Sequence, residues 1–221
     1  MSTHSEKAAA RFDDWSTTYG EDRISSWFRF YQTLAISKLN LPQHESFLDV
    51  GCGTGWAVRE ASKQLKSGKA CGIDISPKMI AKAVAQTPNS GNIEFRIASS
   101  EAIPYPNETF STVLCTCSFH HYKDPIRALK EIRRVMKRDG KLALLDSARD
   151  VSLAIWLQDR WRRYFERSHV RYYTTSEMKS LLENARLNLT EEITTFKRFL
   201  DHKKAFTGLM LVECIKAGRV P

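Results

Sequence analysis

From residue 47 to residue 146 the chain alternates short apolar runs with stretches of helical periodicity. Strand–helix–strand units of a parallel sheet have this appearance in a sequence, because each buried strand is followed by a helix that returns the chain. The pattern predicts strands at residues 47–50, 70–73, 93–97, 111–117 and 141–146. It therefore restricts the chain to a doubly wound α/β fold.

Two of the intervening helices carry clear start signals. Ser76 is placed to cap a helix that Pro77 opens, and Asp124 stands in the same position before Pro125. The second helix is predicted to run to residue 138, with cations near its negative end, and to stop at Gly140. These local signals agree with the alternation of strands and helices.

The region before the core predicts two helices at residues 5–40, broken around Gly20. Phe12, Trp15 and Tyr19 are spaced by three and four residues and so share one helix face. We expect these helices to cover the carboxyl edge of the sheet.

The region after the core predicts a helix at residues 151–171 that is rich in Trp, Tyr and Arg. A capping box, Thr174 with Glu177, opens a further helix that ends near residue 183. Residues 192–199 and 206–215 are strand-prone. No repeat or long linker divides the 221 residues, so one domain is expected.

Charge and cysteine usage bound the environment and the partners. The chain has 34 Lys and Arg against 25 Asp and Glu, a net charge of +9. This surplus favours nucleic acid, anionic lipid or phosphorylated partners, or simply marks a solvated basic surface. The five scattered cysteines form no C-x-x-C motif, and no signal peptide or long apolar run occurs. These features predict a reduced, cytoplasmic protein without a membrane span, at most in peripheral contact with a membrane.

The segment Asp49-Val50-Gly51-Cys52-Gly53-Thr54-Gly55-Trp56 leads from a strand through a glycine-rich turn into a helix. Glycines there allow a ligand to approach bare backbone beside the unpaired N–H groups of a helix start. A dinucleotide-binding loop would need its third glycine where Trp56 stands, so the spacing disfavours that ligand. Asp49 ends an apolar strand and needs donors, which a cationic or hydroxylated ligand would bring.

Asp74 ends the next predicted strand, nineteen residues after Gly55. Sheet geometry brings its side chain beside the glycine turn. An ionised carboxylate at that place suits a ribose diol, because it can accept from both hydroxyls.

Several motifs together resemble the class I S-adenosylmethionine-dependent methyltransferases. They are Asp49-x-Gly51-x-Gly53-x-Gly55, Asp74 within GIDISPKMI, the IPYPNETF stretch, and SFHHYKDP followed by a helix and KRDGKLALLD. Within this class the chain is most similar to the small-molecule, quinone-biosynthesis-like type 11 branch.

The resemblance implies a fold and a division of the chain. It implies a Rossmann-like, doubly wound, mostly parallel sheet of seven strands, the last antiparallel, with an N-terminal helical cap. Residues 1–221 would form a single methyltransferase domain. Its parts would be the N-terminal helices at 1–40, a cofactor-binding core at 41–147, and lid or insert helices with terminal strands at 148–221.

The resemblance also implies S-adenosyl-L-methionine as the cofactor. Asp49 and the 51–55 turn would face its methionyl and ribose parts, Asp74 would hold the ribose hydroxyls, and Ile75 would flank the adenine. Serine stands at positions 99 and 111, where the family usually has acids. The full set of candidate cofactor-binding residues is Tyr19, Asp49, Gly51, Cys52, Gly53, Gly55, Asp74, Ile75, Met79, Ser99, Ser100, Glu101 and Cys117.

The acceptor side is expected after the fourth strand, at Cys115-Thr116-Cys117-Ser118-Phe119-His120-His121. An N-P-P-Y sequence, typical of amide or nucleobase nitrogen methylation, is absent, whereas H-H-x-x-D-P resembles the small-molecule branch. A neutral imidazole suits proton removal from an acceptor near pH 7. His120 is therefore the first candidate for a base or substrate-orienting group and His121 the second; alternatively, either one bonds backbone after the strand.

Cys115 and Cys117 lie two residues apart and are expected to share one strand face. No further Cys or His is spaced to complete a metal site with them, so apolar packing is favoured and no metal is predicted.

The basic aromatic stretch at residues 149–171 remains open to several interpretations. Four interpretations are consistent with its composition: a pocket lid, a membrane-surface face, a nucleic-acid patch, or a helix with a core face and a solvated basic face. The main hypothesis is methyl transfer to an O, C or N atom of a small molecule, anionic or aromatic in character. The alternatives are an RNA or protein acceptor, and a non-catalytic cofactor-binding subunit; the oligomeric state stays open.

Overall fold

The computed structural model describes residues 4–17, 23–39, 41, 43–87, 91–166, 168–198 and 206–216. Tyr19, one of the candidate cofactor-binding residues, lies outside these ranges. No helix in the described ranges has the length and hydropathy needed to cross a membrane.

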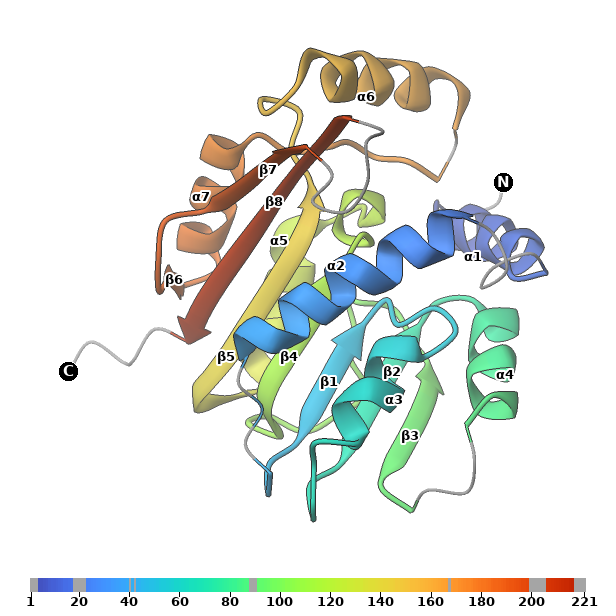
Figure 1. Ribbon diagram of the computed structural model, residues 1–221, viewed down its shortest axis with the longest axis vertical. Helices are drawn as coiled ribbons and strands as arrows, with labels where there is room; N and C mark the ends of the chain where they lie inside the picture. Colours follow the sequence, from blue (N-terminus) through green and yellow to red (C-terminus); the bar gives the residue numbers. More distant parts are fainter. Residues whose placement is uncertain are drawn as a thin grey trace.

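A single twisted sheet forms the centre of the molecule (Figure 1). Its strands are β1 (Phe47–Val50), β2 (Ala70–Asp74), β3 (Ile93–Ile97), β4 (Phe110–Thr116), β5 (Met136–Ser147), β6 (Leu187–Leu189), β7 (Thr194–Arg198) and β8 (Phe206–Lys216). The order is β3-β2-β1-β4-β5-β8-β6, with β7 also paired to β8. Strands β1 to β5 pair in parallel and β8 runs antiparallel to β5, which confirms the predicted architecture.

Within the described residues the sheet has eight strands, where seven were predicted. The additional strand is β6, three residues that pair with the end of β8. A strand this short lacks a recognisable alternation, and its pairing partner lies far along the chain.

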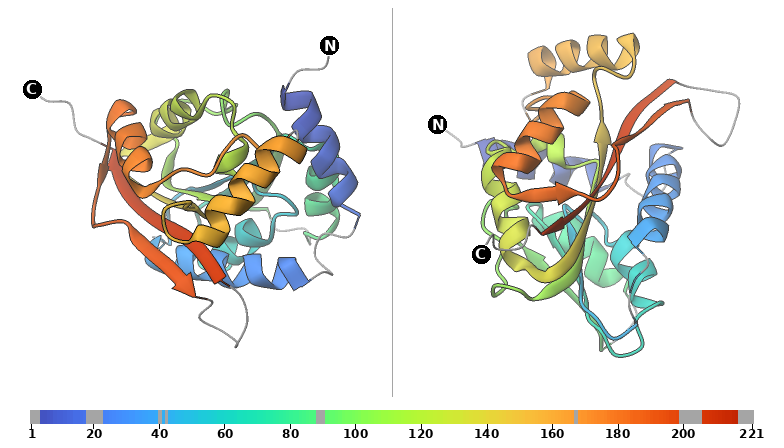
Figure 2. Two further views of the ribbon diagram at one scale, coloured as in Figure 1. Left: turned by 90° about the horizontal axis from the view of Figure 1, so that it is seen from above. Right: turned by 90° about the vertical axis from the view of Figure 1, so that its left-hand side faces the viewer.

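Helices cover both faces of the sheet, as a doubly wound fold requires (Figures 1 and 2). They are α1 (His4–Trp15), α2 (Arg23–Leu39), α3 (Trp56–Ser62), α4 (Pro77–Ala85), the 3-10 turn η1 (Phe119–His121), α5 (Pro125–Val135), α6 (Leu153–Phe165) and α7 (Thr175–Asn184). One apolar core includes Leu129 of α5 and Met178 of α7, and a second core includes Tyr31 of α2 and Val58 of α3.

The predicted caps are present. Ser76 Oγ accepts from the backbone N–H of Met79 at 3.1 Å, and Asp124 Oδ1 accepts from that of Arg127 at 2.9 Å. The capping box of Thr174 with Glu177 has both of its bonds. These bonds satisfy N–H groups that the first helical turn leaves unpaired.

The end of the second capped helix was predicted wrongly. Helix α5 ends at Val135, and Met136 begins β5, where it is fully buried and pairs with Phe110. Gly140 lies inside β5 and caps no helix. Strand pairing and burial of Met136 outweigh the local signals that favoured a longer helix.

Helix α6 lies outside the two helical layers (Figure 2). Its one buried residue among those described is Asp159, whereas its large apolar residues are exposed. These are Leu153, Trp156, Leu157, Trp161, Tyr164 and Phe165. The interpretation of this stretch as a helix with an apolar core face is therefore wrong.

Candidate active site

The turn after β1 is built on glycines with left-handed backbone angles. Gly51, Gly53 and Gly55 have φ values of 80°, 52° and 76°. A Cβ on Gly51 would lie 2.6 Å from Ser118 Cβ, and one on Gly55 would lie 2.5 Å from the ring of Phe95. Both the turn and the packing against neighbouring segments thus require glycine at positions 51 and 55.

Asp74, at the end of β2, lies beside this turn as the sequence predicts. Its Oδ2 accepts from the N–H of Gly53 and its Oδ1 from the N–H of Ser76, each at 2.9 Å. Burial raises the pKa of Asp74, and these two backbone bonds oppose the rise. The carboxylate is therefore fixed in place with its remaining lone pairs available to a ligand.

Asp49, on β1, is fully buried, and neither carboxylate oxygen has a hydrogen-bond partner among the described residues. Burial, reinforced by the nearby Asp74, raises the pKa of Asp49 to about 8. A buried carboxyl group without donors is destabilising. Such a group points to a ligand that brings donors.

A cavity opens at the carboxyl ends of β1, β2 and β4. Many candidate residues line it, namely Gly51, Cys52, Gly53, Asp74, Ile75, Met79, Ser99, Ser100, Glu101, Cys117 and His121. Asp49, Gly55 and His120 do not line it. Thr116 and Ser118 of the expected acceptor segment also line it. Further lining residues that the sequence did not single out for the site are Ala8, Gln32, Ile73, Ala98, Tyr122 and Lys123.

Helix α1 contributes Phe12 and Trp15 to the cavity wall, so two of the aromatic residues expected on one helix face do lie together, at the carboxyl edge of the sheet. On one side, Asp13 of α1 accepts from Ser76 Oγ at 2.5 Å. On the other side, Arg11 Nη1 donates to Ser168 Oγ at 2.8 Å. Helix α1 is thereby held across the cavity between α4 and the segment after α6.

Cys115 and Cys117 do not share a face as predicted. Cys115 is buried in the core that contains Leu129, whereas Cys117 lies beyond the end of β4, has φ of 51° and lines the cavity. The strand alternation ends at Thr116, so the expectation based on it fails. Burial raises the pKa of Cys115 to about 12, so its thiol is protonated at neutral pH.

His120 is buried behind the cavity and bound to Asp146 at the end of β5. The backbone N–H of His120 donates to Asp146 Oδ2 at 3.0 Å, and Nδ1 lies 2.7 Å from Oδ1. Burial lowers the pKa of His120 well below its ordinary value and raises that of Asp146 to about 6. Near pH 7 the ring is neutral, with Asp146 as the acceptor for Nδ1–H.

His121 is the histidine of the pair that reaches the cavity. Its Nδ1 lies 2.8 Å from the carbonyl oxygen of Ser168, and its ring packs edge-on against Phe12 with centroids 4.9 Å apart. Since a carbonyl only accepts, Nδ1 carries the hydrogen and Nε2 the lone pair. Burial lowers the pKa of His121, so this ring is also neutral.

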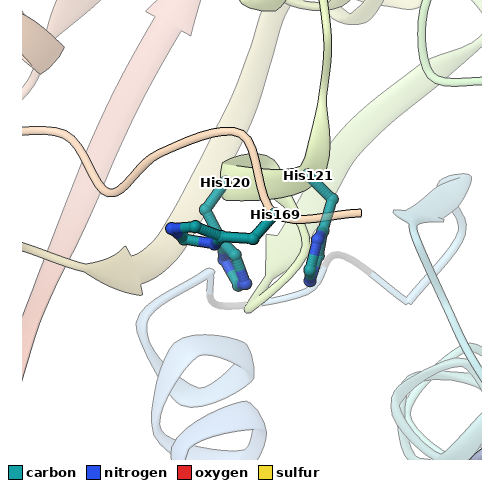
Figure 3. A group of neighbouring side chains, drawn as sticks. All are labelled: His120, His121 and His169. Carbon is teal, nitrogen blue, oxygen red and sulfur yellow. The ribbon is translucent and has the colours of Figure 1, made fainter. Parts of the chain in front are cut away.

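A third histidine, His169, joins the pair (Figure 3). It comes from the segment after α6, which the backbone N–H of Val170 links to the carbonyl oxygen of His120 at 3.0 Å. Its Nε2 lies 2.9 Å from Asp159 Oδ1, and its side chain is completely buried. No sequence spacing signalled His169, because only the fold brings it to His120.

A glycine turn after the first strand, an acid after the second and a parallel sheet closed by an antiparallel strand define a nucleoside-binding α/β domain. Residues 48–144 match the type 11 family model described as "Methyltransferase domain". This segment belongs to the class I methyltransferases of that branch, and S-adenosylmethionine is the cofactor of the class.

Individual relatives agree with this assignment. The uncharacterized methyltransferase YcgJ of Bacillus subtilis is 28% identical over 137 residues, 61% of this chain and 53% of its own length. The ubiquinone/menaquinone biosynthesis C-methyltransferase UbiE of Geobacter sulfurreducens is 36% identical over 122 residues, 53% of this chain and 48% of its own. The chain thus spans about half the length of the curated relatives it matches.

Solved structures show the same fold. A chain in the complex between the Haloferax volcanii Trm112 methyltransferase activator and the putative methyltransferase superimposes with a TM-score of 0.77. The match covers 94% of this chain and 98% of that one at 17% identity. At this identity the likeness concerns the fold alone.

Proposed function

We propose that this protein is an enzyme that transfers the methyl group of S-adenosylmethionine to a small-molecule acceptor. One observation carries the proposal: a single cavity extends from the glycine turn and Asp74 to His121, beneath helix α1. The cofactor half and a neutral imidazole therefore open onto the same space. We further propose that residues 1–221 act as one domain, because α1 lines this cavity and also bonds the segment after α6 through Arg11 and Ser168.

The residues around the cavity fit the cofactor. Asp49 is buried without donors close to the cavity residues Cys52 and Asp74. A ligand with an ammonium group and ribose hydroxyls brings the missing donors. We propose that Asp74 accepts from the hydroxyls and that Asp49 stabilises the cationic end.

The remaining candidates would enclose the rest of the cofactor. Ile75, Met79 and the 99–101 segment would surround its adenine, and Cys117 would lie near the methionyl part. Tyr19, outside the described residues, stays a proposed contact with the methionyl end. The cofactor supplies a methyl group on a positively charged sulfur that leaves readily, so positioning provides most of the rate.

We propose that His121 removes the proton from the acceptor. Its ring lines the cavity and its Nδ1 bond to Ser168 directs the basic Nε2 lone pair away from the backbone. His120, fixed by Asp146, orients the 3-10 turn that carries His121. A hydroxyl or an activated carbon that must lose a proton is therefore the acceptor class that this site suits.

The cavity wall favours an aromatic or anionic acceptor. Phe12, Trp15 and Tyr122 offer aromatic surface, and Lys123 offers a cation. Aromatic faces and a nearby ammonium group bind planar or negatively charged molecules. Which atom receives the methyl group, O, C or N, depends on the identity of the acceptor.

A macromolecular acceptor is the second candidate, and one observation favours it. Helix α6 exposes apolar residues interleaved with Arg160 and Arg163, a surface that a small acceptor does not need. RNA binding with a steep salt dependence would support this candidate.

Calorimetry tests the cofactor half of the proposal. S-adenosylmethionine or its demethylated product should bind with a dissociation constant in the micromolar range, and NAD should not bind. If neither sulfur nucleoside binds, the proposed function is wrong.

Mass spectrometry tests the transfer. A cell extract incubated with enzyme and methyl-labelled cofactor should yield one labelled small molecule, absent with His121→Gln. If the label is found in RNA or protein of the extract instead, the acceptor is a macromolecule, as the second candidate function proposes.

A further inference from the structure

His120, His121 and His169 form one compact cluster of imidazoles beside the cavity (Figure 3). One ring nitrogen from each residue lies within 4.8 Å of those of the other two. Two of the rings come from η1 and the third from the segment after α6, so the tertiary fold brings the third ring to the other two.

Each ring also bonds an oxygen acceptor through one of its two nitrogens. The three bonds are His120 Nδ1 to Asp146 Oδ1 at 2.7 Å, His121 Nδ1 to Ser168 O at 2.8 Å, and His169 Nε2 to Asp159 Oδ1 at 2.9 Å. A carbonyl or an ionised carboxylate can only accept, so each bond fixes the tautomer and leaves a lone pair on the opposite nitrogen. Histidines that bind metals in proteins are held by oxygen acceptors in this way.

The lone pair of His169 is an independent sign of a ligand. Its Nδ1 is buried and has no hydrogen-bond partner among the described residues, while the side chain as a whole is completely buried. An unpaired acceptor in an apolar interior is destabilising, and packing of the three rings against one another does not give this nitrogen a hydrogen-bond donor. A cation at the centre of the cluster would use this lone pair.

We infer that His120, His121 and His169 form a binding site for a first-row divalent transition metal, with Zn²⁺ as the reference ion. Neutral imidazoles are preferred ligands of these ions, and three of them with an open fourth position form the donor set of a catalytic site. In a tetrahedral Zn²⁺ site the ligand nitrogens lie about 3.4 Å apart. The rings must therefore draw together slightly from their present 4.8 Å limit.

Charges around the cluster are compatible with a cation. Asp146 and Asp159 lie behind two of the rings as carboxylates. Two guanidinium groups that oppose a positive charge at His120 are those of Arg11 and Arg162. Both form ion pairs with Glu166, so their charges are offset locally.

The open position of such a metal would face the cavity, because His121 lines the cavity while the other two rings are buried behind it. This consequence rests on the proposed function. A water bound there loses a proton near neutral pH. With the lone pair of His121 bound to the metal, the resulting hydroxide would replace His121 as the base and take the proton of an acceptor hydroxyl to give water; the acceptor oxygen would then attack the methyl carbon, the C–S bond would break, and the uncharged thioether would leave.

The test uses the untagged chain, stripped of metal with a chelator and dialysed. Zn²⁺ is titrated in a calorimeter, and Co²⁺ is titrated while its ligand-field absorption is followed. We expect one site per chain with a dissociation constant of about 1 μM or tighter. The absence of a saturable site, or a Co²⁺ spectrum of the fully hydrated ion, would overturn the inference.

Variants assign the ligands. His169→Gln keeps an N–H donor for Asp159, and His121→Gln alters a residue that is only partly buried, which guards against a variant that does not fold. Each should weaken metal binding at least tenfold, because changes around metal sites typically lower metal affinity by about 10- to 100-fold. The matched control, His44→Gln, changes an exposed histidine bound to Ser67 and should leave the affinity unchanged. Equal affinity in all three variants would defeat the site.

Cofactor binding on the same samples separates the two proposals. S-adenosylmethionine binding without a saturable metal site defeats the metal site alone. Metal binding that depends on His121 and His169, without S-adenosylmethionine binding, defeats the proposed function and leaves the metal site standing.

Discussion

Two buried carboxyl groups, Asp49 on β1 and Asp159 on α6, have opposite surroundings. Neither oxygen of Asp49 has a partner among the described residues, and burial raises its pKa to about 8. Asp159 is also nearly inaccessible to solvent but has several donors, namely Tyr172 N at 2.6 Å, Arg163 Nη2 at 2.6 Å and His169 Nε2 at 2.9 Å. Burial would raise the pKa of Asp159, but these donors together hold it below its ordinary value.

The difference separates a residue that stabilises the fold from one that binds. Asp159 gains more from its donors than it loses on desolvation, and it fixes both α6 and His169. Asp49 has only the desolvation cost in the ligand-free chain, so its contribution becomes favourable when a ligand brings donors. Sequence features alone do not separate the two, since both are single acids in apolar or aromatic stretches.

Removal of Asp159 should have the largest effect on stability. Asp159→Ala leaves His169, Arg163 and the N–H of Tyr172 without their acceptor, and we expect the free energy of unfolding to fall by about 3–5 kcal/mol. Urea unfolding followed by circular dichroism measures this. Asp139→Ala, at an exposed position, serves as the control and should stay within about 0.5 kcal/mol. A loss below 1 kcal/mol for Asp159→Ala would remove the contrast with Asp49.

Asp49→Asn should raise the free energy of unfolding, whereas Asp159→Ala lowers it. The folded chain keeps the Asp49 proton up to about pH 8, whereas the unfolded chain releases it near the ordinary value. The folded state therefore binds more protons between about pH 4 and pH 8, and this group lowers the free energy of unfolding as pH rises through that window.

The asparagine variant should thus be more stable than the native chain at pH 8 by about 1–3 kcal/mol, and nearly equal to it at pH 5. The groups that face Asp49, Asp74 and the thiols of Cys52 and Cys115, remain the same in both proteins. Parallel stability curves from pH 5 to pH 8 would show that Asp49 is ionised in the folded chain. The same variant should bind S-adenosylmethionine less tightly.

Features encoded within a few residues were predicted from the sequence. The glycine turn, the acid at position 74 and the caps at Ser76 and Thr174 all depend on short spacings that physical rules interpret directly. For this reason the glycine turn, the position of Asp74 beside it and the parallel core of the sheet followed from the sequence.

Features that depend on contacts between distant segments were not predicted. His169 meets His120 only because the segment after α6 bonds the carbonyl of His120, and Gln32 reaches the cavity because its Nε2 bonds Thr116 Oγ1 at 3.1 Å. The early end of α5 at Val135 has the same cause, a strand pairing with Phe110. Which face of α6 is buried also depends on the partners of Asp159, and hydropathy alone indicated the wrong face.

Asp74 is intermediate between the two carboxyl groups, because two backbone N–H groups satisfy it in part. Asp74→Asn retains an oxygen that accepts one of these bonds but loses the ionised acceptor for ribose hydroxyls. We expect the fold to be kept and the dissociation constant for S-adenosylmethionine to rise about tenfold, the size of one hydrogen bond to a charged group. Calorimetry measures the change, with Asp139→Asn as the control. An unchanged constant would mean that Asp74 only stabilises the turn.

The smallest effect is expected on the outer side of α6. Trp161 and Phe165 are 60% and 63% exposed, and their rings pack on each other with centroids 5.3 Å apart. Trp161→Ala should change the free energy of unfolding by no more than about 0.5 kcal/mol, because little apolar area is removed from the interior. Urea unfolding of Trp161→Ala beside Asp159→Ala compares the two sides of one helix. A loss above 1 kcal/mol for Trp161→Ala would mean that the apolar side is covered in solution, and the helix would then be stabilised from both sides.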